Sequence, residues 1–184
     1  MDGTIDQKMY SRLIAGFIKE GIAYHEADHG TESAGFIKGA YGNEKQYAGK
    51  YLVKVQYHIV VNRNHSLEEK FATITHELGH LFCGHLGSDN EKLWPSRTGL
   101  SHEVEEFEAE SVSWLICERA GLKNPSEKYL SGYLDEEGQI PLISLETVLT
   151  ATKKIEAMMD GSVKLNKNLK MQDPRSKPEQ HVLF

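Results

Sequence analysis

The spacing of hydrophobic residues predicts four main helices. Apolar side chains recur every three or four residues in each stretch, which places them on one face of a helix. The stretches begin or end at residues typical of helix ends, such as a serine before the start or a glycine after the end. The predicted ranges are residues 5–18, 66–82, 102–120 and 144–158. A shorter helix is expected to begin at Asn124 and Pro125.

Between the first two helices the pattern changes to short β-prone pieces separated by glycine and polar residues. The clearest strand covers residues 51–62, and its end, residues 59–61, is apolar on both faces. A strand with two apolar faces is expected to lie against helices. The region therefore predicts a small sheet of about three strands.

Length and periodicity indicate a single domain. The chain has 184 residues, enough for one domain with a hydrophobic core. Periodicity is lost after Gly161 and lysines accumulate, so we expect a domain over residues 1–161 and a polar, mobile tail over residues 162–184. Cys83 and Cys117 lie in apolar helical patterns, which favours buried thiols over a disulfide or metal ligands.

The charge balance argues against direct nucleic-acid binding. The chain has 21 Lys and Arg against 27 Asp and Glu, and its formal net charge of −6 repels phosphate backbones. The first ten residues carry acids where a signal peptide needs basic residues, and no apolar run is long enough to span a membrane. We therefore expect a cytoplasmic protein that binds neither nucleic acid nor membranes. Its oligomeric state is left open.

The second predicted helix contains the segment FATITHELGHLFCGH, residues 71–85. Residues four apart on a helix project from the same face, so His76 and His80 can bind one zinc ion. Glu77 lies beside that face, where it can take a proton from a water that attacks a peptide bond. This HExxH pattern is typical of metallopeptidases. The alternative, two polar helix positions beside a glutamate that forms a salt bridge, fits poorly in an apolar stripe.

A catalytic zinc needs a third protein ligand, and the third predicted helix offers carboxylates. Glu106 and Glu110 share a face with Ala109 and Ser113, two small residues that would let this helix approach the HExxH helix closely. Glu108 is expected to point elsewhere. The alternative is a solvated acidic face, which the helix dipole favours near a helix N-terminus.

These motifs together resemble the ImmA/IrrE metallopeptidase family. The resemblance rests on FATITHELGHLFCGH, on GAY at residues 39–41 and HIVVN at residues 58–62 before it, and on EFEAESVSWLIC after it. The continuation CERAGL…SEKYLSGYL is similar to the ArdC-like antirestriction branch. The resemblance covers about residues 35–160. It implies an α+β, zincin-like core in which a small antiparallel sheet packs on the helices that carry HExxH.

The resemblance also implies roles for single residues. Glu106 corresponds to the third zinc ligand, and Glu110 to a residue that hydrogen-bonds a ligand. Family members usually have Asn or Asp at the position of Glu110, so the longer side chain here could compete for the metal. Tyr41, His85 and His102 are candidates to stabilise the oxyanion, and each could instead be structural. No helix-turn-helix segment is recognisable, so a regulatory partner would be a separate chain.

Two functions are compatible with these inferences. The first is zinc-dependent hydrolysis of peptide bonds, with Zn²⁺ on His76, His80 and Glu106 and with Glu77 as the general base. The resemblance implies site-specific cleavage of a repressor-like, DNA-binding regulator in a stress-response or mobile-element module. The second is a zinc-bound interaction module that binds a regulator, or opposes a host defence system, without cutting. Glu77 favours the first, because a structural zinc site needs no general base.

Overall fold

The chain combines helices with two small sheets. The structure is a computed structural model, and it describes residues 2–30, 33–123, 126, 130–134, 139–173 and 175. Its α-helices are α1 (Gln7–Phe17), α2 (Leu67–Cys83), α3 (His102–Arg119) and α5 (Leu145–Met159), and its 3-10 helices are η1 (Ile18–Glu20), η2 (Ser131–Tyr133) and η3 (Lys167–Leu169). The predicted α+β fold class is confirmed. The helix expected at Asn124 and Pro125 lies outside the described residues. None of the described helices has the length and apolar character that a membrane span requires.

The larger sheet is mixed, and the prediction of an antiparallel sheet is wrong for one of its two pairings. Its strands are β1 (Ile22–Ala27), β2 (Gly35–Gly39) and β5 (Tyr57–Asn62), in the order β1-β5-β2. Strand β5 runs antiparallel to β2 and parallel to β1. The chain reverses direction between β1 and β2 and again before β5, which then inserts between the two earlier strands. Alternation along a strand identifies its faces but not its neighbours, so the pattern could not give this order.

The predicted strand over residues 51–62 is two strands in two sheets. Strand β4 (Tyr51–Lys54) pairs with β3 (Lys45–Ala48) in an antiparallel hairpin, separate from β5. The Val55 N–H donates to the Glu44 carbonyl at 2.9 Å, whereas the Gln56 N–H donates to the Gly21 carbonyl at 2.7 Å. The backbone therefore changes partner between these two residues, from the hairpin to the segment that leads into β1.

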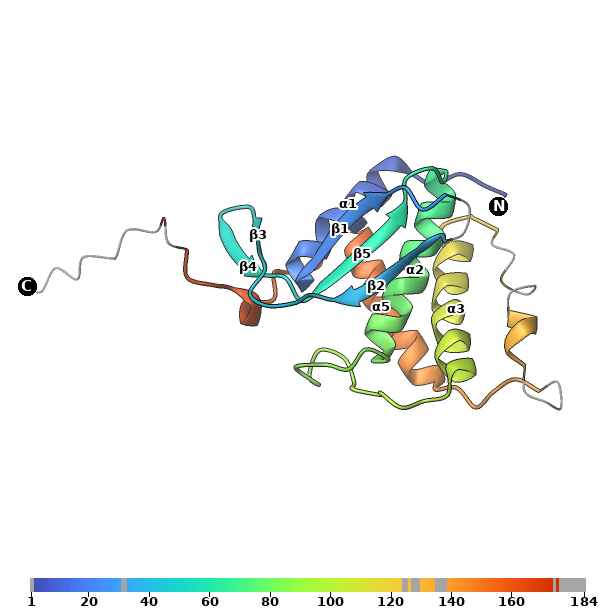
Figure 1. Cartoon of the computed structure of the whole chain (residues 1–184). Helices are drawn as coiled ribbons and strands as arrows, with labels where there is room; N and C mark the ends of the chain where they lie inside the picture. Colours follow the sequence, from blue (N-terminus) through green and yellow to red (C-terminus); the bar gives the residue numbers. More distant parts are fainter. Residues whose placement is uncertain are drawn as a thin grey trace, which may run out of the picture.

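Residues that follow α5 contact the hairpin. Leu169 in η3 is buried, and the Met171 N–H donates to the Leu52 carbonyl at 2.8 Å. Figure 1 shows η3 and the hairpin together at the end of the molecule away from α3. The division into a domain over residues 1–161 and a mobile tail over residues 162–184 stays a prediction, although the described start of that tail is packed against β4.

Helix α2 begins and ends at residues that define it sharply. The Ser66 hydroxyl accepts from the Glu69 N–H at 3.2 Å, and the Glu69 carboxylate accepts from the Ser66 N–H at 2.8 Å, which is the predicted capping box. At the other end Gly84 has a φ of 86°, a left-handed conformation that glycine adopts without strain. A Cβ added at Gly84 would lie 2.1 Å from the Pro95 carbonyl oxygen. The loop after α2 is therefore packed directly on the end of the helix.

Helix α2 occupies the centre of the fold. It packs on β2 and β5 and also contacts α3 and α5 (Figure 1). The side chains buried between these elements are mostly apolar, and they include Ile59, Phe71, Leu78, Ile116 and Ile155. Cys83 and Cys117 are free and buried, which confirms the predicted placement of both thiols in the core.

Helices α2 and α3 approach closely at Gly79. A Cβ added at Gly79 would lie 2.9 Å from both the Cα and the carbonyl oxygen of Ala109. One turn earlier in α2 and one turn later in α3, the Thr75 and Ser113 hydroxyl oxygens lie 3.1 Å apart. The prediction that Ala109 and Ser113 permit a close approach is confirmed.

Replacing Gly79 with alanine should destabilise the protein. Helix propensity alone would favour alanine by about 1 kcal/mol. The added methyl group would instead press on the Ala109 backbone, and such overpacking typically costs about 1–3 kcal/mol. Urea unfolding of the metal-free protein measures the difference. The control is Gly132→Ala, where an added Cβ has no atom within 4 Å. Equal or greater stability of Gly79→Ala would contradict the close packing of the two helices.

Candidate metal centre

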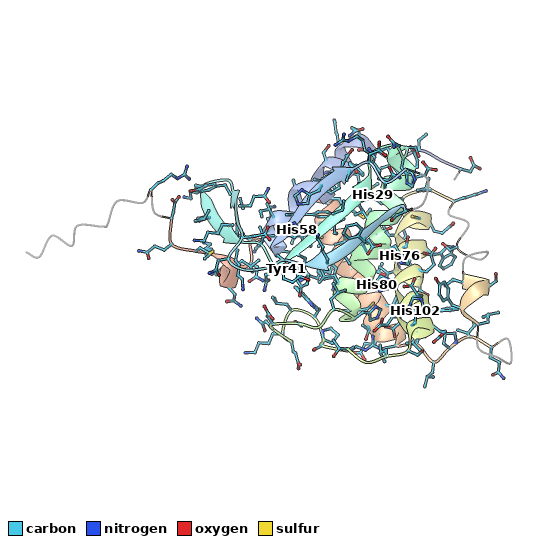
Figure 2. The ribbon with its side chains drawn as sticks, in the orientation of Figure 1. His29, Tyr41, His58, His76, His80 and His102 are labelled. Carbon is cyan, nitrogen blue, oxygen red and sulfur yellow. The ribbon has the colours of Figure 1, made fainter. Side chains whose placement is uncertain are left out.

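Helices α2 and α3 bring three of the predicted donors together. His76 and His80 lie one turn apart on α2 (Figure 2), and their Nε2 atoms are 3.1 Å apart. The carboxylate of Glu106 on α3 faces them, with Oε2 at 3.5 Å from His76 Nε2 and Oε1 at 3.4 Å from His80 Nε2. The structure therefore places both predicted histidines and the predicted third ligand around one point.

The spacing of these donors is compatible with binding of one metal ion. A metal–ligand distance of about 2.0–2.1 Å implies donor atoms about 3.3–3.4 Å apart in a tetrahedron. The separation of the two Nε2 atoms lies within about 0.3 Å of that value, and each imidazole lies at a similar distance from a different oxygen of Glu106, Oε2 for His76 and Oε1 for His80. Each of the three side chains is between 13% and 15% exposed, so the group is partly open to solvent. The residues present can hold a metal and leave room for a further ligand.

Glu110 contacts the far side of the His76 ring. Its Oε2 lies 3.0 Å from His76 Nδ1, and its side chain is buried. If Nδ1 carries the proton and donates to this carboxylate, the lone pair of Nε2 points at the donor group. The longer side chain of glutamate therefore reaches an imidazole nitrogen.

Glu77 lies beside the donor group rather than in it. The Ile37 N–H on β2 donates to Glu77 Oε2 at 2.9 Å, which holds the carboxylate between α2 and the sheet. Burial raises the pKa of Glu77 above its usual range, although His76 and His80 oppose this shift. A carboxylate with a raised pKa accepts a proton more readily, as a general base must.

The donors share protons when no cation is bound. Burial alone would lower the pKa of His76, but hydrogen bonds with Glu106 and Glu110 outweigh it and raise this pKa to about 9. Burial would raise the pKa of Glu106, but hydrogen bonds from His76 and His80 lower it well below its usual range. Binding a cation must displace such protons, so uptake is favoured as pH rises.

A comparison with protein families agrees with this geometry. Residues 39–114 match the IrrE N-terminal-like domain of the peptidase M78 family. Over this segment the chain is similar to that peptidase domain. The segment contains His76, Glu77, His80 and Glu106 and therefore supports a metallopeptidase of the ImmA/IrrE type. In the other two comparisons, no curated protein and no solved structure matches the chain. The ArdC-like branch stays a prediction.

The three oxyanion candidates lie in different places. Tyr41 is 86% exposed and lines a cavity with Glu44 and His58 on the sheet. His102 Nδ1 lies 3.8 Å from Glu106 Oε1, so this ring borders the donor group. His85 is buried behind His80, and their Nδ1 atoms are 3.0 Å apart. Of the three, His102 is the one that lies at the partly exposed side.

A second group of potential metal donors consists of Cys83, His85 and Glu108, all buried. The Glu108 carboxylate already accepts two hydrogen bonds from Arg97, whose positive charge opposes a cation. Burial, together with the charge of Glu108, raises the pKa of the Cys83 thiol to about 12. A metal would need the thiolate, so this group is a poor metal site.

Sequence reasoning missed the role of Glu108. The prediction that it points away from Glu106 agrees with the structure, but Glu108 is fully buried and hydrogen-bonded to His85 and Arg97. No spacing in the sequence signals this contact, because Arg97 comes from a loop between α2 and α3. A buried glutamate two positions after a ligand candidate is indistinguishable from a solvated one until the helix face is known.

Glu106→Gln should weaken zinc binding more than Glu110→Gln. The first change alters a donor, and the second alters a hydrogen bond to His76, for which losses of about 10–100-fold are typical. Competition with a chelator of known zinc affinity gives the ranking, and wild-type protein should hold one zinc per chain. The control is Glu118→Gln, an exposed glutamate on the same helix. The opposite ranking would exchange the roles of Glu106 and Glu110.

Proposed function

We propose that the chain is a zinc-dependent metallopeptidase that hydrolyses peptide bonds in a protein substrate. The observation that carries the proposal is the spacing of His76, His80 and Glu106, with the partly buried carboxylate of Glu77 beside them. Two imidazoles and one carboxylate are a typical ligand set for catalytic zinc, which keeps a further position for water or substrate. The partial exposure of the three donors is consistent with such an open position.

The proposed chemistry divides between the metal and Glu77. Zinc held by the three donors would polarise the scissile carbonyl and lower the pKa of a water to about 7. Glu77 takes a proton from the attacking water and later passes it to the leaving amine. The hydrogen bond from Ile37 keeps the Glu77 carboxylate in place for both transfers. Glu110 holds the His76 ring so that its Nε2 faces the metal position.

Strand β2 supports a peptide as the substrate. It lies at the edge of the sheet, and the Ile37 N–H that contacts Glu77 belongs to it. An extended peptide can add to an exposed sheet edge through main-chain hydrogen bonds. Pairing with β2 would bring a peptide bond next to Glu77 without any requirement for a deep pocket.

We further propose that the substrate is a repressor-like, DNA-binding regulator of a stress-response or mobile-element module. This class of substrate follows from the resemblance to the ImmA/IrrE family. The net charge of −6 supports it, because DNA-binding proteins are basic and opposite charges speed encounter. A cytoplasmic location is part of the same proposal.

A zinc-bound module that binds a regulator, or opposes a host defence system, without cutting is the second candidate. One observation favours it: several apolar side chains around the start of α5 are exposed. They are Ile140, Leu142, Leu145 and Leu149. A group of exposed apolar residues is typical of protein contact surfaces. This candidate needs no general base, so it leaves the position of Glu77 unexplained.

Glu77→Gln should abolish turnover and leave binding intact. The amide is nearly isosteric and no donor is lost, so fold, zinc content and substrate binding should persist. Removing proton transfer should lower the cleavage rate by about 10²–10⁴-fold. Wild-type and variant proteins are mixed with the DNA-binding regulator encoded beside this gene, and cleavage and complex formation are followed separately.

Glu118→Gln serves as the control, because it changes an exposed glutamate away from the donors. Cleavage by wild type that is lost in Glu77→Gln supports the peptidase. Equal cleavage by both proteins would refute the role of Glu77. A regulator that binds both proteins and is cut by neither would favour the interaction module.

A further inference from the structure

A chain of hydrogen bonds extends from His80 into the protein interior, on the side away from Glu106. His80 Nδ1 lies 3.0 Å from His85 Nδ1, and His85 Nε2 lies 3.0 Å from Glu108 Oε2. Arg97 Nη2 donates to Glu108 Oε1 at 2.8 Å. His85, Glu108 and Arg97 are not among the three candidate metal donors, so these contacts are additional to the donor group.

The direction of these hydrogen bonds follows from the role of His80. Its Nε2 faces the donor group and must present a lone pair to a metal, so Nδ1 carries the proton. His80 Nδ1–H then donates to His85 Nδ1, which leaves the His85 proton on Nε2. That proton is donated to the Glu108 carboxylate. One tautomer of each ring satisfies both the His80–His85 and the His85–Glu108 contact, and it is the tautomer that metal binding by His80 requires.

Glu108, at the end of this series of hydrogen bonds, is held in place by several contacts. The side chains of His85 and Glu108 are 2% and 0% exposed. Glu108 accepts two bonds from Arg97 and one from the Ser144 N–H at the start of α5, at 2.8 Å. A buried carboxylate is costly unless it is paired and hydrogen-bonded, and both of its oxygens are bonded here. The carboxylate is therefore a fixed acceptor for His85.

The backbone also fixes His85 relative to His80. The His85 N–H donates to the His80 carbonyl at 3.0 Å, directly after the left-handed turn at Gly84. The Nδ1 atoms of the two candidate ligand histidines therefore have different hydrogen-bond partners. His76 contacts the carboxylate of Glu110 directly, whereas His80 reaches Glu108 through a second imidazole.

We propose that His85 is a positioning residue that orients His80 for zinc and that Glu108 fixes the tautomer of His85. The inference rests on the proposed function, because it assigns a role toward the zinc of that site. It also replaces the expectation that His85 stabilises an oxyanion, since its ring lies behind His80 in the protein interior.

The test compares His85→Leu with His85→Asn. Leucine removes the acceptor for His80, whereas asparagine places Oδ1 close to the position of the imidazole Nδ1 and keeps that acceptor. Zinc affinity is measured by chelator competition, and the absorption spectrum of cobalt-substituted protein reports the geometry of the donors. Urea unfolding of the metal-free variants measures any effect on the fold. His25→Leu, at an exposed histidine on β1, is the matched control.

His85→Leu should bind zinc about 10–100-fold more weakly and shift the cobalt spectrum, as is typical when a partner of a ligand histidine is lost. His85→Asn should recover most of the affinity and the wild-type spectrum, and His25→Leu should match wild type. Unchanged zinc affinity in folded His85→Leu would overturn the inference and leave the peptidase intact. Equal loss in His85→Leu and His85→Asn would also overturn it. Wild-type protein that binds no zinc would instead refute the proposed function.

Discussion

The close contact between α2 and α3 is the constraint on which the candidate site depends. His76 and His80 come from one helix and Glu106 from the other, so the separation of the two helices sets the distance between donors. Gly79 lies between the two histidines in sequence and faces the Ala109 backbone. A larger side chain at this point would move the carboxylate away from both imidazoles. The glycine in HELGH therefore has a packing role that is separate from the chemistry of its neighbours.

Hydrogen bonds behind the donors add a second constraint, on orientation rather than distance. Glu110 bonds the back of His76, and His85 bonds the back of His80. The α2–α3 contact brings Glu110 within reach of His76, whereas the turn at Gly84 directly after α2 places His85 beside His80. The Thr75–Ser113 hydrogen bond between the helices holds their register near the site. The donors are thus largely preorganised by the protein before any cation arrives.

Local patterns predicted the parts of this arrangement that depend on one helix at a time. The His76 and His80 spacing, the small residues on α3 and the capping box at Ser66 are all properties of a few neighbouring residues. They could be read because helical periodicity converts sequence spacing into a shared face. The position of Glu106 could be inferred only once the two helices were assumed to pack together.

Features that depend on the path of the whole chain could not be predicted. The insertion of β5 between β1 and β2 is set by tertiary pairing, which alternation along a strand does not encode. The burial of Glu108 requires Arg97 from a loop and the N–H of Ser144 at the start of α5. An acidic residue near a helix N-terminus is usually solvated, so the sequence favoured an exposed Glu108 rather than a buried one.

The identity of the atoms that bind zinc in the loaded protein is the decisive test of the site on α2 and α3. X-ray absorption at the zinc edge distinguishes nitrogen and oxygen ligands from sulfur by distance. Binding by His76, His80 and Glu106 predicts two imidazoles and further oxygen ligands, all at about 2.0–2.2 Å. A zinc–sulfur distance of about 2.3 Å would place the ion at Cys83 and contradict the account.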